Sequence, residues 1–509
     1  MTSRRQFIAS GSLALCLGGL GARAAAAAQS RTVTIAFPMD VPSWDPVVSA
    51  HPTVSAIYKC VFDQPLNLAP DTGFGASVVK SHEWLDERCT QLALDFRDDV
   101  YFHNGDKLTA EDFKFTFHDR VKAEPATLLA GVWRGVDRIE TAGPLRAVMH
   151  FAKPMATAPI MLADIPAYIL PKDYYTRVGA EGFVKAPVGS GPYRLVEYER
   201  DTRIVLEAVP GYWQGEARIK RVIFRMTKDA TARAAAIQTG QADVTINLTV
   251  REAERLGALP NVSTHLDPTT GVVLLQLVNQ GVFKDRNVRL AAHHAIDKPA
   301  ISKALFGGHA TSIYVPAGPG MPGYVPDFTI PYDPDRARAL LKESGWGPDT
   351  PLSFSLYTTR GTFPSDFDIA RVIVQMWKQV GLNATLTVLD GPTMYDYQRN
   401  GKFDGPVLKP FNPAGGDPGT YSGYMLDPAM SFSIWKGDDI PPRLYPLMAE
   451  PDETRRIEGF RQFDQWQVEQ GYSIPLFLGL TTIAARDDVG FQPYRSGVLM
   501  PYAWSGART

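Results

Sequence analysis

The chain lacks the motifs that mark the common enzyme and metalloprotein classes. Its 509 residues contain no HExxH, GxSxG or GxxxxGK[ST] sequence, so zincin, hydrolase and P-loop chemistry have no support. Only three cysteines occur, with no CxxC among them, which leaves redox and zinc roles equally unsupported. We therefore expect no catalytic residue, no metal site and no cofactor.

One GxGxxG sequence is present, at Gly318, Gly320 and Gly323. Pro319 and Pro322 interrupt it, and no helical pattern follows. Because a dinucleotide site needs a strand before this motif and a helix after it, we interpret the segment as a loop.

An excess of either charge is also missing. The 52 basic and 54 acidic residues nearly balance, which argues against nucleic acid as the main partner. A hydrophobic content of 45% and a charged content of 21% are typical of a soluble globular protein. A chain of 509 residues is too long for one ordinary core, so two or more lobes are expected.

No apolar run reaches the roughly 20 residues of a membrane-spanning helix. The most apolar N-terminal stretch, residues 8–20, follows Ser-Arg-Arg-Gln-Phe-Ile and precedes a run of alanines. This arrangement is similar to a twin-arginine export signal. We expect a signal peptide over residues 1–28 and export to the periplasm; the alternative is an anchor helix with a chance pair of arginines.

Two cysteines, Cys60 and Cys89, remain beyond the predicted signal peptide. In an oxidising compartment they could form a disulfide, or each could be a separate buried thiol. Their spacing in the sequence does not decide, because pairing depends on the distance between the two Cα atoms.

The most informative segment is residues 100–117, VYFHNGDKLTAEDFKFTF. Its first residues alternate as in a half-buried strand, and Asn-Gly-Asp then has the chemistry of a turn. Thr109 lies three residues before Asp112, a close variant of the capping box that begins a helix. Phe113 and Phe117 form one apolar stripe of that helix.

Other local patterns predict further elements. N-cap residues precede helical patterns at Asp229, Asp333 and Ser365. Alternating residues predict strands at 32–37, 147–151, 204–209 and 384–388.

Several further segments have distinctive sequence motifs. In chain order they are DVPSWDP at residues 40–46, PVGSGPYRL at 187–195, QTGQADV at 238–244, FKDRNVRLAAHHAID at 283–297 and DPDRARALLKESGW at 333–346. Together with residues 100–117, they resemble the signature of the family 5 extracellular solute-binding proteins, the peptide, nickel and opine receptors of ABC importers.

This resemblance implies an α/β fold of the two-lobe periplasmic binding protein type, large and of cluster C, with mixed sheets and a hinge of two crossings. The expected divisions are lobe 1 at residues 29–268, lobe 2 at 269–483, and a return segment to lobe 1 at 484–509. The implied function is a periplasmic receptor that closes its lobes around a small solute, such as a di- or oligopeptide or a related amino-acid derivative. Its partners would be this ligand and the permease subunits in the inner membrane, and we expect a monomer that binds no nucleic acid.

Two alternatives to a receptor remain: a periplasmic enzyme and a sensory adaptor on the same fold. Alternative ligands are an opine, an oligosaccharide or a nickel complex. Nickel is less favoured because no histidine follows His309. His293 and Asp297 share a helix face, but we interpret this histidine as structural.

Two charged residues are the main candidates for ligand binding. Arg360 stands where dipeptide-binding members of the family carry an arginine for the ligand carboxylate, and its guanidinium suits that role; the alternative is a surface arginine. Asp417 resembles the family's aspartate for the ligand ammonium group; the alternative is an Asp-Pro turn.

Aromatic residues would supply the apolar walls of the site. Phe411 stands in place of the tryptophan that the peptide binders usually carry shortly before this aspartate. Trp44 and Tyr421 are further candidates, although each could instead belong to the core.

Overall fold

A computed structural model of the chain describes residues 31–48, 52–164, 166–347, 350–360, 362–412, 414–430 and 433–506. The predicted signal peptide at residues 1–28 lies outside these ranges. In the part that is described, no helix is both long and apolar enough to cross a membrane.

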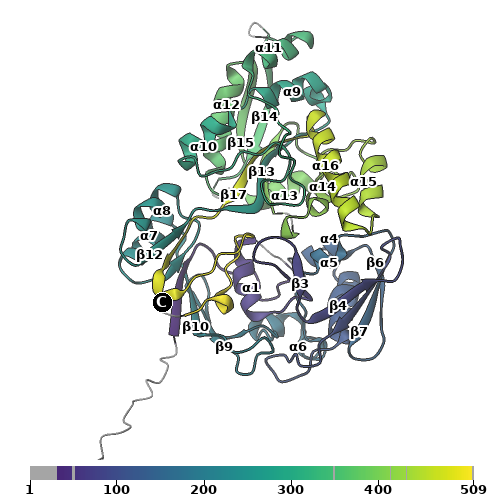
Figure 1. Ribbon diagram of the computed structural model, residues 1–509, viewed down its shortest axis with the longest axis vertical. Helices are drawn as coiled ribbons and strands as arrows, with labels where there is room; N and C mark the ends of the chain where they lie inside the picture. The colour runs from purple at the N-terminus through teal and green to yellow at the C-terminus, as the bar shows by residue number, and fades with distance from the viewer. Residues whose placement is uncertain are drawn as a thin grey trace, which may run out of the picture.

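The molecule consists of two α/β lobes (Figure 1). The lower lobe in that view contains the N-terminal half of the chain together with the yellow C-terminal segment, and the upper lobe contains the green middle part. Each lobe has its own large hydrophobic core. The two-lobe expectation is therefore confirmed.

Lobe 1 contains two main sheets. The first is mixed and seven-stranded, in the order β12 (Val262–His265), β18 (Ile483–Arg486), β11 (Val244–Thr245), β1 (Arg31–Phe37), β10 (Ile219–Met226), β9 (Arg203–Ala208) and β8 (Tyr193–Glu199). The second is four-stranded and antiparallel, in the order β4 (Val79–Trp84), β5 (Gln91–Phe96), β7 (Arg146–Phe151) and β6 (Val136–Thr141). A short ladder joins β2 (Leu66–Leu68) to β3 (Phe74–Ala76).

The helices of lobe 1 surround these sheets. They are α1 (Ser55–Val61), α2 (Ala110–Lys114), α3 (Arg120–Ala123), α4 (Leu128–Trp133), α5 (Ala158–Met161), α6 (Lys172–Lys185), α7 (Ala230–Gln238) and α8 (Val250–Gly257).

Lobe 2 is built on a five-stranded mixed sheet. Its order is β15 (Leu382–Val388), β14 (Leu352–Thr358), β16 (Val407–Phe411), β13 (Pro268–Gln276) and β17 (Ser473–Leu480). Strand β14 is parallel to β15 and β16, whereas β13 is antiparallel to β16 and β17.

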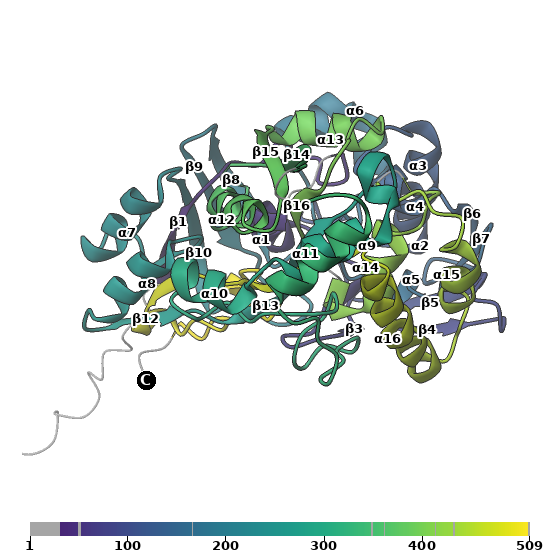
Figure 2. The ribbon, with the colours of Figure 1, turned by 90° about the horizontal axis from the view of Figure 1, so that it is seen from above.

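In the described part of lobe 2, eight helices accompany this sheet. They are α9 (Arg286–His294), α10 (Lys298–Phe306), α11 (Pro334–Glu343), α12 (Asp366–Lys378), α13 (Gly391–Arg399), α14 (Pro418–Met425), α15 (Pro441–Met448) and α16 (Glu453–Glu469). Helices α15 and α16 lie above the side of lobe 1 that carries the four-stranded sheet, as both views show (Figure 1 and Figure 2).

The chain passes between the lobes from β12 to β13 and again from β17 to β18. The two passages are hydrogen-bonded to each other: Thr481 N donates to Asp267 O at 2.9 Å, and Asp267 N donates to Thr481 Oγ1 at 3.1 Å. The connection therefore consists of two neighbouring extended segments, as a hinge of two crossings requires.

The predicted helix starts follow from local chemistry. Asp229 caps α7 by accepting from Ala232 N at 2.8 Å, and Asp333 caps α11 by accepting from Arg336 N at 2.8 Å. Ser365 does precede α12, but its side chain makes no capping hydrogen bond. The strands predicted from alternation correspond to β1, β7, β9 and β15.

The segment at residues 100–117 is partly as predicted. Asp112 Oδ2 accepts from Thr109 N at 2.8 Å, which is the capping-box contact, and the buried rings of Phe113 and Phe117 are 4.6 Å apart. The strand prediction is wrong: residues 100–103 form only an isolated bridge from Tyr101 to Lys107. Alternation at residues 92–96 and 100–102 predicts that these two segments form an antiparallel pair. Strand β5 instead pairs with β4 and β7 on its two edges, so no edge remains for residues 100–102.

Cys60 and Cys89 are both buried and are not joined by a disulfide. The open choice between a disulfide and two separate thiols is thereby resolved in favour of separate thiols.

Candidate ligand-binding site

The two lobes touch through the loop that follows β16. Gly73 N of lobe 1 donates to Gly415 O of lobe 2 at 2.9 Å. A Cβ atom on Gly415 would lie 2.7 Å from Ile160 Cδ1 and 2.8 Å from Gly73 O, so only glycine permits this approach. A second contact joins Ala156 N to Met448 O at 3.0 Å.

The carboxyl ends of two parallel strands of lobe 2 lead to this region. Strand β14 is followed by Arg360, and strand β16 is followed by a short 3-10 turn at Ala414–Gly416 and then Asp417. The two parallel strands are neighbours at Tyr357 of β14, which lies opposite Val407 of β16. Crevices outside the carboxyl ends of strands are the usual ligand sites of open α/β sheets. The carboxyl end of β16 therefore lies where lobe 2 meets lobe 1, through Phe411 and Gly415.

Arg360 is exposed at this edge. Its guanidinium carbon lies 3.6 Å from the ring centre of Phe367 on α12, a cation–π contact that fixes the direction of the side chain. Within the described ranges, Arg360 has no carboxylate partner. The guanidinium is thus available to an external anion.

Asp417 is buried, with 4% of its surface exposed. Its Oδ1 accepts from Arg456 Nη1 at 2.8 Å and its Oδ2 from Arg456 Nη2 at 2.6 Å. Oδ1 also accepts from Gly419 N at 2.8 Å, which caps α14. Both oxygens are therefore engaged inside lobe 2, and this geometry favours the structural alternative for Asp417.

Phe411 lies between the lobes. It is half-buried and packs against the cores of both lobe 1 and lobe 2. Its ring meets that of Tyr421 edge-on, with centres 5.1 Å apart. Tyr421 is itself only 1% exposed and belongs to the core of lobe 2, so Phe411 is the aromatic residue of this pair that faces lobe 1.

Trp44 is placed in the core of lobe 1. Its exposed fraction is 2%, and its ring packs edge-on against Tyr198 at 5.5 Å. The core alternative accounts for this burial without a ligand.

Sequence reasoning missed a cation on β16. Lys409 is half-buried, and burial lowers the pKa of its ammonium group to about 7. It stands in Val-Leu-Lys-Pro-Phe, where a lone lysine inside an apolar strand was the available signal. No described residue forms a hydrogen bond or ion pair with its ammonium group.

A second recessed lysine, Lys59, lies on α1 of lobe 1. Burial lowers its pKa to about 8, although the charges of Asp164 and Asp63 act in the opposite direction. Its Nζ donates to Gln64 Oε1, and Gln64 Nε2 donates to Asp164 O at 2.6 Å. Unlike Lys409, this lysine has a partner in the protein.

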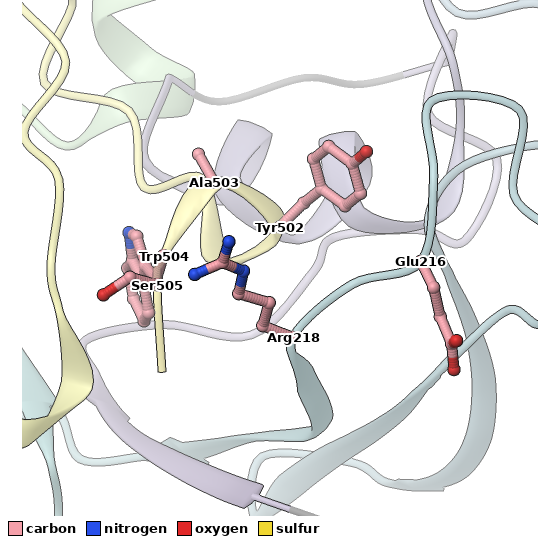
Figure 3. Close-up of a pocket in the computed structure, with 6 residues that line it drawn as sticks. All are labelled: Glu216, Arg218, Tyr502, Ala503, Trp504 and Ser505. Carbon is pink, nitrogen blue, oxygen red and sulfur yellow. The ribbon is translucent and has the colours of Figure 1, made fainter. Parts of the chain in front are cut away.

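One open pocket is remote from the contact between the lobes. It has a volume of about 340 Å³ and is lined by lobe 1 alone, through Glu216, Arg218 and residues 502–505. The Arg218 guanidinium points toward the turn at Tyr502 and Ala503, and Glu216 lies to one side (Figure 3). Because no residue of lobe 2 contributes, closure of the lobes would not enclose a ligand there.

A much smaller cavity, of about 20 Å³, adjoins Lys59 and Asp63; such a volume holds about one water molecule. Burial raises the pKa of Asp63 to about 6, against the hydrogen bonds that it accepts from Tyr212 Oη at 2.8 Å and Trp213 Nε1 at 3.1 Å. We regard this network as structural.

No group of three or more His, Cys, Asp or Glu side chains in the described part of the chain could hold a metal ion. His293 is 1% exposed, and its Nε2 lies 3.2 Å from the Nζ of Lys298. Asp297 instead caps α10 by accepting from Ala300 N at 2.9 Å. His293 is therefore buried beside Lys298, and Asp297 is an N-cap residue.

The geometry is that of a two-lobe binding protein whose lobes are joined by two neighbouring extended segments. Residues 76–431 match the model of the bacterial extracellular solute-binding proteins, family 5. The chain belongs to this family. It is therefore a solute-binding protein and not an enzyme.

Comparison with individual proteins agrees with this assignment. The chain is 27% identical over 398 residues to the dipeptide-binding protein of Escherichia coli K12, covering 72% of this chain and 73% of that protein. It is 25% identical over 373 residues to the glutathione-binding protein GsiB of the same strain, covering 72% of this chain and 71% of GsiB.

Solved structures share the fold at lower identity. A dipeptide-binding protein of Pseudoalteromonas sp. SM9913 in complex with Met-Leu has a TM-score of 0.81 at 19% identity, covering 93% of this chain and 99% of that chain. NikA of Brucella suis in complex with Fe(III)-EDTA has a TM-score of 0.82 at 20% identity, with the same coverage of 93% and 99%. The two ligands differ in chemistry, so the fold alone does not select one.

Proposed function

We propose that this protein is the periplasmic receptor of an ABC importer and that it captures a small peptide or a related amino-acid derivative between its lobes. The observation that carries the proposal is the meeting of the lobes beyond the carboxyl end of β16, where Gly73 contacts Gly415 and Phe411 packs against both cores. Hinge closure would bury the solute and present a closed surface to the permease. The receptor would act as a monomer and reach the periplasm by the twin-arginine pathway.

The ligand class is supported by the relatives and by Arg360. The curated relatives are described as binding a dipeptide or glutathione, and both ligands carry a carboxylate. The exposed guanidinium of Arg360 is suited to such a group because its fork donates two parallel hydrogen bonds.

The other predicted residues would serve the site in different ways. Phe411 would provide an apolar wall. Asp417 would hold the loop at residues 412–417 in place through Arg456, and Tyr421 and Trp44 would support the site from the cores of the lobes. Each role matches the burial and the partners described above.

A thermal-shift screen of the purified protein tests the proposal. The panel contains dipeptides, tripeptides, glutathione, opines, oligosaccharides and nickel–histidine complexes. Binding to the folded state raises the melting temperature, by an increment that grows with ligand concentration above the dissociation constant. We expect a rise with at least one peptide or amino-acid derivative; a rise confined to sugars or to nickel complexes would refute the ligand class.

A further inference from the structure

We propose that Lys409 contacts an acidic group of the captured solute, so that the site selects ligands with a carboxylate at this position. The inference rests on the proposed function, since it names the chemistry of the solute that the lobes enclose. It begins from the position of Lys409 in the sheet.

Lys409 lies on β16, the central strand of the lobe 2 sheet, beyond the residue pair that joins β16 to β14. Its strand β16 is flanked by β14 on one side and β13 on the other, and Lys409 is directly opposite Leu274 of β13. Leu274 is fully buried. A lysine is disfavoured at such a place, because strands inside a sheet favour β-branched and aromatic residues.

The side chain lies on the face of the sheet that α14 covers. Residues two apart on a strand share a face, so Lys409 shares its face with Phe411, whose ring packs against Tyr421 of α14. Gln276, also on this face, donates from Nε2 to Met425 O of α14 at 2.7 Å. Lys409 precedes Phe411 by two residues on β16, and Phe411 contacts the cores of both lobes. Lys409 is therefore close in the chain to the contact between the lobes.

The ammonium group has no partner among the residues that the structure describes. Burial is the only cause of its lowered pKa, with no contribution from a neighbouring charge. A desolvated cation without an anion is unfavourable, and proteins normally pair such groups or bind a ligand with them. Lys409 is half-buried, and no described residue occupies the donors of its ammonium group.

The other desolvated cations of the chain show the contrast. Arg233 donates to four backbone carbonyls, and Arg289 donates to three. Lys298 donates to Ile313 O at 2.9 Å, and Arg456 is paired with Asp417. Lys409 therefore differs from them in having its donors unoccupied.

Isothermal titration calorimetry with matched ligands tests the assignment. The probes are the peptide-class ligand found in the screen and its amidated analogues, with each carboxylate replaced in turn by an uncharged carboxamide. Lys409→Met keeps the length and apolar stem of the side chain and removes the charge. We expect wild-type protein to prefer one carboxylate form over its amide by tenfold or more, and Lys409→Met to lose that preference while still binding the amide.

Matched variants separate a specific effect from misfolding. Lys409→Arg retains a cation and should retain the preference. Lys402→Met removes an exposed lysine of the same lobe, which is paired with Asp396, and should change nothing. Arg360→Met should affect only the carboxylate that Arg360 contacts.

Proton uptake gives a second readout that a structural role would not produce. Since the ammonium group has a pKa of about 7, binding of a carboxylate at pH 8 should draw a proton onto Lys409. Titrations in buffers of different ionisation enthalpy should reveal uptake in the wild type and less uptake in Lys409→Met. An unchanged carboxylate preference in Lys409→Met would overturn the inference, whereas the absence of binding by any peptide-class probe to wild type would instead refute the proposed function.

Discussion

Arg456 on α16 holds Asp417, the residue that begins α14, through two hydrogen bonds of 2.8 and 2.6 Å. The pair is buried, and it joins the helix that follows the interlobe loop to the longest helix of lobe 2. Asp417 is consequently a residue whose replacement should affect folding before it affects recognition.

We predict that Asp417→Ala destabilises the protein by about 3–5 kcal/mol, because it leaves the guanidinium of Arg456 buried and unpaired. Urea unfolding without ligand would measure this loss. The double variant Asp417→Ala, Arg456→Met removes both partners and should recover part of the stability. An Asp417→Ala protein of unchanged stability that no longer binds α-amino ligands would instead establish a direct ligand contact.

The close approach of Gly415 to lobe 1 predicts an effect on closure. Gly415→Ala should weaken ligand binding by about tenfold or more, because the added Cβ would meet Ile160 and the Gly73 carbonyl and hold the lobes apart. Gly401→Ala is a matched control: Gly401 also has a positive φ, of 61°, but no atom lies within 4 Å of an added Cβ. Calorimetric affinities for the two variants should differ, and equal affinities would contradict the prediction.

Asp464 predicts an unusual dependence of stability on pH. Burial raises its pKa to about 7, against the hydrogen bond that Ser422 Oγ donates to its Oδ1 at 2.5 Å. An unfolded aspartate titrates near 3.9, so between about pH 4 and pH 7 the folded state holds a proton that the unfolded state has released. Stability should therefore fall as the pH rises through this window, by up to about 1.4 kcal/mol per unit from this group, and level off above pH 7.

Asp464→Asn isolates this contribution, since other groups also titrate in the window. The stability difference between the variant and wild type, from urea unfolding at each pH, should move in favour of the variant as the pH rises from 4 to 7. A difference that stays constant with pH would show that Asp464 is ionised throughout.

The two cysteines predict the response to thiol reagents. Cys60 and Cys89 are buried, and burial raises the pKa of both thiols, that of Cys89 to about 11. Thiolate, the reactive form, is therefore scarce at neutral pH. Protein lacking residues 1–28 should react with neither thiol when native and with both in denaturant, and reductant should leave its melting temperature unchanged. A shift in melting temperature with reductant would indicate a disulfide.

Local chemistry explains what the sequence could predict. The caps of α7 and α11 depend on residues within three positions of Asp229 and Asp333, so they are visible in a short window. The predicted strand at residues 100–103 was wrong because alternation cannot reveal that β5 already has two neighbours.

The candidate site also shows that a short window of the sequence does not reveal contacts between distant residues. Asp417 was predicted to bind the ligand, with an Asp-Pro turn as the alternative, but its partner Arg456 is 39 residues away on another helix, and nothing in the sequence links the two. Lys409 is visible as a charge in an apolar strand, yet its lack of a partner depends on the packing of α14 and the neighbouring strands. The contacts of each charge therefore depend on packing that no short window of the sequence contains.

Strand β18, which lies between β12 and β11 in the large sheet of lobe 1, comes after the whole of lobe 2 in the chain. Lobe 1 consequently cannot complete its sheet during synthesis until all of lobe 2 has been made. The completion of lobe 1 therefore depends on the prior synthesis of lobe 2, and only a chain that includes β18 can contain both complete sheets.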